Sequence, residues 1–211
     1  MKKSSDVKIM LKEAGILFAI TLIAGLVLGF VYELTKEPIR IQQELKVQRA
    51  CAAVFPAAEE GSLVFEQSKY VPDETFAAEL AATGVEIGKV FEAASADGSF
   101  YGYVVESTTS EGYGGDIILY VGVTNDGILS GVSILDIAET PGLGMQAEDV
   151  LIPQFGNKQV PEFTYTKTGS TSESEIDAIS GATVTTKAVT NAVNGGLKVA
   201  LNLMEGGAAN E

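Results

Sequence analysis

The residues best suited to chemistry lie late in the chain, in the stretch Asp177–Thr186. Three hydroxyl side chains, those of Thr183, Thr185 and Thr186, fall together where a helix is expected to begin, with Ser180 as its predicted N-cap. The unpaired backbone N–H groups and partial positive charge at a helix N-terminus suit a phosphate group. Two interpretations follow: the hydroxyls only cap the helix, or they bind a phosphate-bearing ligand.

The elements on both sides of this stretch can be read from their patterns. Residues 164–175 in front of it are polar and are expected to lack regular structure. Lys187–Met204 after it repeats apolar side chains every four residues, which places them on one face of a helix. These side chains are Val189, Val193, Leu197 and Leu201. A terminal helix is therefore predicted over Lys187–Met204.

The middle of the chain carries strand patterns separated by turn residues. Asn125-Asp-Gly127 stands between two apolar runs and predicts a tight hairpin. A short helix is predicted earlier, over Asp73–Leu80. The predicted strands are Gly88–Ala94 (as an edge strand), Ser99–Thr108, Asp116–Thr124 and Gly127–Ile137. An antiparallel sheet flanked by helices gives the fold class α+β.

Two glycine-rich loops flank the predicted hairpin. Gly112-Tyr-Gly-Gly115 precedes its first strand, and Glu139-Thr-Pro-Gly-Leu-Gly144 follows its second. Neither loop matches the Gly-x-Gly-x-x-Gly fingerprint of dinucleotide folds or a phosphate-binding Gly-Lys-Thr. Two interpretations stay open for both loops. The glycines serve tight turns, or they let backbone amides approach a planar ring.

Composition excludes several classes of protein. Residues 57–211 carry 23 acidic and 6 basic side chains, a net charge of −17, so nucleic-acid binding is not expected. The sequence has no histidine and one cysteine, Cys51. It therefore lacks the residues for a Ser-His-Asp or Cys-His triad, an iron–sulfur cluster or an internal disulfide. Cys51 is predicted to be a buried side chain that contributes to packing. Any redox chemistry therefore requires an organic cofactor.

The N-terminal part predicts a membrane anchor. Ala14–Tyr32 is a run of 19 residues without charge, long enough to span roughly 28 Å as a helix. Four lysines precede it: Lys2, Lys3, Lys8 and Lys12. They place residues 1–13 in the cytoplasm and the bulk of the chain outside. A cleavable signal peptide is the competing interpretation, but no clear small-x-small cleavage site follows the run.

The predicted organisation is therefore an anchor over residues 14–33, a stalk helix over residues 34–56 and an extracytoplasmic domain over residues 57–211. Pro38 is expected to break the helix between anchor and stalk. No internal repeat is present.

The order Asp-x-x-Ser-Gly-Ala-Thr at Asp177–Thr183 resembles the flavinylation motif of FMN-binding domains. These domains occur in the G subunit of the Rnf-type electron-transport complex and in the similar C subunit of the sodium-translocating NADH:quinone oxidoreductase. Both families also carry a Gly-Tyr-x-Gly element and a Glu-Thr-Pro-Gly-Leu-Gly element ahead of the motif. The family often has Ser where this chain has Thr186. The shorter length of this chain favours the Rnf-type protein.

The resemblance implies that Thr183 carries FMN through a phosphoester bond. It implies that a separate flavin transferase attaches the FMN, with FAD as donor and a divalent metal. Asp177 is either recognised by that transferase or caps a turn. The other residues that the resemblance places at the cofactor are Ser180, Gly181, Ala182, Tyr113, Gly114, Glu139, Thr140, Gly142, Leu143 and Gly144.

Two functions from different classes follow. The first is a covalent flavoprotein subunit that relays electrons in a ferredoxin:NAD oxidoreductase complex coupled to sodium or proton translocation, with other membrane subunits as partners. A quinone-reductase C subunit is the related alternative. Such a chain cannot oxidise NADH or ferredoxin alone, because it has neither a nicotinamide fold nor iron–sulfur ligands. The second is an anchored extracytoplasmic binding domain without cofactor, in which Thr183 only caps a helix.

Overall fold

The computed structural model describes residues 3–59, 61–72 and 74–206. The chain divides into two compact units, Met1–Leu45 and Lys46–Glu211. Helix α1 (Lys3–Ala53) runs through Pro38 without interruption, so the predicted break at Pro38 is wrong. A proline inside a helix removes one backbone hydrogen bond and costs about 3 kcal/mol or more, and α1 nevertheless continues as helix on both sides of Pro38.

The apolar part of α1 is long and hydrophobic enough to cross a membrane. Its most apolar 18-residue window has a mean hydropathy of 2.6, and none of that window is buried against the rest of the protein. An exposed apolar run of this length would be unfavourable in water. The predicted anchor over residues 14–33 lies inside this helix.

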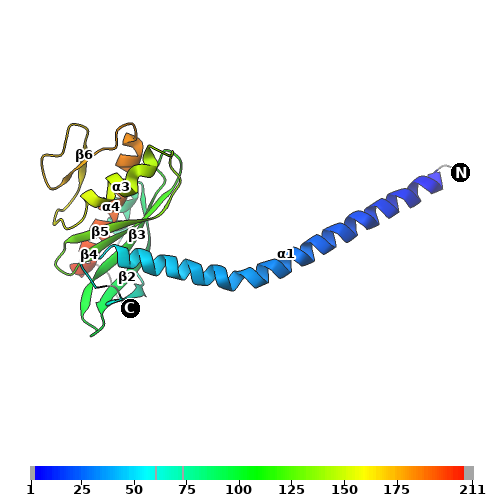
Figure 1. The fold of residues 1–211 in the computed structure, drawn as a ribbon, viewed down its shortest axis with the longest axis horizontal. Coiled ribbons are helices and arrows are strands. Elements are labelled where there is room, and N and C mark those ends of the chain that lie inside the picture. Colours follow the sequence, from blue (N-terminus) through cyan, green and yellow to red (C-terminus); the bar gives the residue numbers. More distant parts are fainter. Residues whose placement is uncertain (1–2, 60, 73, 207–211) are drawn as a thin grey trace. The chain divides into compact units, whose positions relative to one another are not determined.

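The second unit is built on a five-stranded antiparallel sheet in chain order, which confirms the class α+β (Figure 1). The strands are β1 (Leu63–Ser68), β2 (Val85–Ser95), β3 (Phe100–Thr109), β4 (Ile117–Thr124) and β5 (Leu129–Ile137). The four predicted strands match β2 to β5. β1 was not predicted, so β2 is the second strand rather than the edge. Only Leu63 and Phe65 alternate inward in β1, which is too short a pattern to predict a strand.

Helix α4 (Thr183–Met204) covers one face of the sheet and forms the main core with it. Its close approach depends on Gly196, where an added Cβ would lie 2.6 Å from Cγ2 of Val121. The predicted apolar stripe is confirmed, because Val189, Val193 and Leu197 are fully buried and Leu201 is partly buried against the same core. The beginning of this helix is therefore held in place by the sheet.

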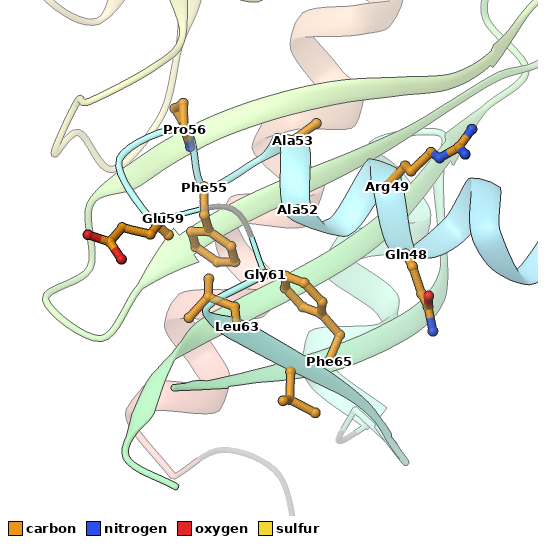
Figure 2. A pocket seen from close by; sticks show the side chains of 12 residues that line it. Gln48, Arg49, Ala52, Ala53, Phe55, Pro56, Glu59, Gly61, Leu63 and Phe65 are labelled. Atoms are coloured by element: carbon orange, nitrogen blue, oxygen red, sulfur yellow. The ribbon is translucent and has the colours of Figure 1, made fainter. Parts of the chain in front are cut away.

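Residues 50–55, at and just after the end of α1, pack on the opposite face of the sheet. Cys51 and Val54 are fully buried there against Val104 and Tyr120, so the predicted packing role of Cys51 is confirmed. Next to this contact, between the end of α1 and β1, lies a cavity of about 730 Å³. Figure 2 shows its mainly apolar lining, which includes Phe55 and Phe65. The two rings are stacked, with their centroids 6.3 Å apart.

Short elements complete the second unit. Helix α2 (Glu74–Ala82) matches the helix predicted from Asp73, which itself lies outside the described residues. After β5 come η1 (Gly144–Gln146), α3 (Ala147–Val150), η2 (Ile152–Gln154), β6 (Thr164–Thr166) and β7 (Glu175–Asp177).

The parallel pair β6–β7 lies at the two ends of the run 164–175, for which no regular structure was expected. Side-chain hydrogen bonds organise the loop between the two strands. The Asp177 carboxylate accepts from the N–H of Ser170, and the Glu175 carboxylate accepts from the N–H and O–H of Thr171. Three-residue strands held by side chains leave no periodic pattern in a sequence.

Candidate functional site

The first turn of α4 differs from its prediction in how it is capped. The N-cap is Ala182, and among the described residues no side chain caps the helix, so Ser180 is not the N-cap. Instead, the hydroxyl of Thr186 stabilises the turn through hydrogen bonds to its backbone. It accepts from the N–H of Ile179 (3.2 Å) and donates to the carbonyl of Ala182 (2.9 Å). Gly181 makes the turn possible, with φ at +79°.

This turn separates the three threonines that were expected to present their hydroxyls together. Thr186 and Thr185 are buried, with 0% and 1% of their surface exposed, whereas Thr183 is only partly buried. The structure therefore leaves Thr183 as the accessible hydroxyl of the first turn. A helix N-terminus without a side-chain cap also leaves its first backbone N–H groups available to an anion.

The two glycine-rich loops meet through the side chain of Glu139. Its Oε1 atom accepts from the N–H of Tyr113 (2.7 Å) and from the N–H of Gly114 (3.3 Å), although 25 residues or more separate the partners in sequence. Only 7% of Glu139 is exposed. The loop that precedes β4 is thus joined to the loop that follows β5.

Both loops and the first turn of α4 surround one cavity of about 480 Å³. Its volume falls within the range of roughly 300–1,000 Å³ that is usual for small-molecule sites. Of the predicted site residues, the structure brings these eight to the cavity: Tyr113, Glu139, Thr140, Leu143, Gly144, Gly181, Ala182 and Thr183. The larger cavity beside β1 holds none of them. The smaller cavity is the better candidate, because hydroxyl, amide and carboxylate groups converge there.

The cavity is bordered by apolar side chains that solvent reaches. Tyr113 is 76% exposed, Val184 50% and Leu143 41%. Exposed apolar side chains that gather at one opening are typical of a binding surface. A planar apolar ring system is the kind of ligand that would cover them.

Four predicted residues do not line the cavity. Gly114 acts through its backbone N–H to Glu139, and Gly142 is an open turn residue with φ at +77°. Ser180 is exposed in the turn before α4. Asp177 holds the β6–β7 loop through its carboxylate, and its own N–H donates to Oε1 of Gln154 (2.7 Å). Of the two roles considered for Asp177, this geometry favours the turn cap.

Two more residues of the first turn of α4 line the cavity. Thr185 was expected there only as one of the three hydroxyls of the first turn, and Val184 was not predicted, because a single apolar residue among threonines carries no signal of its own. Gly144 sits between two site residues. A Cβ on it would lie 2.6 Å from Oε2 of Glu139 and 2.7 Å from Oγ1 of Thr185.

Comparisons with known proteins agree with this geometry. The FMN-binding domain family matches residues 112–198, and the RnfG N-terminal region family matches residues 1–54. The chain is 33% identical over 96% of its length to the G subunit of the Na(+)-translocating ferredoxin:NAD(+) oxidoreductase complex of Acetobacterium woodii, and covers 97% of that protein. It is 33% identical over 86% of its length to the G subunit of the proton-translocating ferredoxin:NAD(+) oxidoreductase complex of Clostridium ljungdahlii, and covers 90% of it.

One solved structure is also similar. The crystal structure of Shewanella oneidensis NqrC matches 56% of this chain and 61% of its own, with 24% identity and a TM-score of 0.47.

Proposed function

Because this chain belongs to the family of G subunits of ion-translocating ferredoxin:NAD(+) oxidoreductase complexes, we propose that it is a membrane-anchored flavoprotein that relays electrons within such a complex. The observation that carries the proposal is the cavity at the start of α4. The cavity is lined by Thr183, with its accessible hydroxyl, and by residues of both glycine-rich loops. All of its lining residues lie within the segment that matches the FMN-binding family.

The residues of the cavity fit FMN. The uncapped N-terminus of α4 suits the phosphate, because its first N–H groups need acceptors and its dipole favours an anion. The exposed side chains of Tyr113, Leu143 and Val184 suit the apolar ring system. Bound FMN supplies electron transfer in single or paired steps, and the surrounding protein orients it and sets its potential.

The attachment that we propose is a phosphoester on Thr183. The Oγ1–phosphorus bond forms while the phosphoanhydride bond of FAD breaks, AMP leaves, and the hydroxyl proton passes to a base. A threonine hydroxyl is a weak nucleophile without such a base. In the described residues, the carboxylate at the cavity is that of Glu139, and one of its two oxygens already accepts two backbone N–H groups. We assign the base and the divalent metal to a separate flavin transferase, as the family resemblance implies.

The orientation that we propose follows from charge. Four lysines lie in the first 12 residues, so the N-terminus stays in the cytoplasm and the flavin domain faces outward. Reporter fusions at the C-terminus test this. Activity of an extracytoplasmic reporter is expected, and activity of a cytoplasmic reporter alone would overturn the orientation.

The relay is tested with Thr183→Val, which keeps the shape of the side chain and removes the hydroxyl. Membranes with this variant are expected to assemble the complex but to lose ferredoxin-dependent NAD reduction, and ion transport with it. Thr190→Val is the matched control, because its hydroxyl donates within α4 to the carbonyl of Thr186 (2.8 Å) and not at the cavity. Full activity of an assembled, flavin-free Thr183→Val complex would leave this subunit a structural role only.

A further inference from the structure

Glu139 is a buried carboxylate with an unusual set of partners. Only 7% of it is exposed, and no lysine or arginine pairs with it in the described part of the chain. A buried charge without a partner is strongly unfavourable. The negative charge of Glu139 is stabilised by the backbone N–H groups of Tyr113 and Gly114, which donate hydrogen bonds to it at 2.7 and 3.3 Å. Hydrogen bonds to an ionised acceptor are stronger than neutral ones.

The backbone around Glu139 is shaped for this contact. A Cβ on Gly112 would lie 2.8 Å from Oε1 of Glu139, and a Cβ on Gly114 would collide with the carbonyl oxygen of Ala138. Side chains at either position would push the 112–115 loop away from the carboxylate. The two glycines therefore allow the 112–115 loop to approach the Glu139 carboxylate closely.

The second carboxylate oxygen faces another part of the site. Oε2 and the Thr185 hydroxyl both border Gly144, since a Cβ there would lie 2.6 Å from the first and 2.7 Å from the second, and all three residues line the cavity. Among the described residues, no group donates a hydrogen bond to Oε2, whereas Oε1 accepts two. One oxygen of the carboxylate is thus hydrogen-bonded to the protein backbone, and the other lies at the cavity.

We propose that Glu139 is a positioning residue that clamps the 112–115 loop against the 139–144 loop and so forms the cavity before any ligand is bound. Tyr113 carries the most exposed of the apolar side chains at the opening, and its own backbone N–H makes the shorter of the two clamp bonds. The clamp therefore fixes the position of the Tyr113 ring. A preformed wall lowers the cost of ordering the loop when a ligand enters.

A second consequence rests on the proposed function. The negative charge of Glu139 at the cavity opposes the gain of negative charge on the flavin when the flavin is reduced. The carboxylate therefore holds the midpoint potential of the flavin lower than a neutral side chain would. Glu139→Gln separates the two effects, because it keeps an acceptor oxygen for the clamp and removes the charge.

The clamp itself is tested without flavin, in the full-length Thr183→Val chain. The measurement is amide hydrogen exchange at Tyr113 and Gly114, whose N–H groups depend on Glu139 for their hydrogen bonds. Glu139→Ala is expected to speed exchange at these two amides by about tenfold or more. Glu139→Gln is expected to keep most of the protection. Glu175→Gln is the matched control, since Glu175 also accepts a backbone N–H, but in the β6–β7 loop.

Unchanged exchange at both amides in Glu139→Ala would overturn the clamp. If that variant also loses protection in β3 and β4, Glu139→Asp replaces it, because aspartate keeps the charge but is one methylene too short to reach both amides. Unchanged protection in Glu139→Asp would then overturn the clamp.

The flavin-loaded chain gives the second readout. An upward shift of the flavin midpoint potential is expected in Glu139→Gln, and an unchanged potential would refute the effect of the charge. If the wild-type chain carries no flavin, the proposed function fails, while the exchange experiment still decides on the clamp.

Discussion

Gly144→Ala tests how tightly the cavity wall is packed. The added methyl group would lie 2.6 Å from Oε2 of Glu139 and 2.7 Å from Oγ1 of Thr185, distances at which something must move. Gly144 is buried, and its conformation is one that alanine can adopt, so the effect is one of space rather than of backbone strain. Overpacking of this kind costs about 1–3 kcal/mol.

Gly142→Ala is the matched control in the same loop. A Cβ there meets nothing within 4 Å, but φ is +77°, so alanine is strained by about 1–2 kcal/mol without touching the cavity. The two variants are therefore expected to lose similar stability for different reasons. Only Gly144→Ala should displace Glu139 and change the absorption spectrum of bound flavin.

The assay is thermal unfolding of the full chain in detergent, combined with the flavin spectrum before unfolding. A loss of 1 kcal/mol corresponds to roughly 2–4 °C in Tm for a unit of this size. A Gly144→Ala chain that has the same Tm and the same flavin spectrum as the wild type would refute the close packing around Gly144. A changed flavin spectrum in Gly142→Ala would refute the separation between the two glycines.

Three further predictions concern other residues. Thr186→Val should lose about 1–3 kcal/mol in denaturant unfolding, because it leaves a buried N–H without its acceptor, while Thr186→Ser should behave like wild type. Burial, with the charge of Glu106, raises the pKa of Cys51 to about 12, so an alkylating reagent at pH 8 should label Cys51 only after denaturation. Hydrogen bonds from Thr171 lower the pKa of Glu175, so Glu175→Gln should be less stable than wild type above the unfolded pKa of about 4.3. That difference in unfolding free energy should disappear as the pH falls through the lowered pKa.

The elements predicted from the sequence are those with a long pattern. The hairpin at Asn125–Gly127 follows from turn chemistry, and the terminal helix follows from apolar side chains repeated every four residues. The apolar repeat predicts the helix only from Lys187, four residues after it begins, whereas Thr183, Thr185 and Thr186 were placed at its beginning by capping signals alone. The hydroxyl of Thr186 is nevertheless buried and bonded to the backbone.

The parts that escaped prediction depend on contacts between distant residues. β1 becomes a strand because β2 pairs with it, and β6 pairs with β7 through a loop held by side chains. The sequence placed Glu139 in the site, but nothing in it shows that the carboxylate binds the amides of Tyr113 and Gly114. A hydrogen bond across 26 residues has no local signature.

The central claim is that Thr183 carries FMN, and intact-mass analysis of the chain purified from its native membranes tests it most directly. The expected mass is that of the chain plus one FMN less one water, with the addition located by fragmentation to the peptide that contains Thr183. Thr183→Val should have the unmodified mass. A wild-type chain without the addition, or an addition that survives in Thr183→Val, would contradict the account.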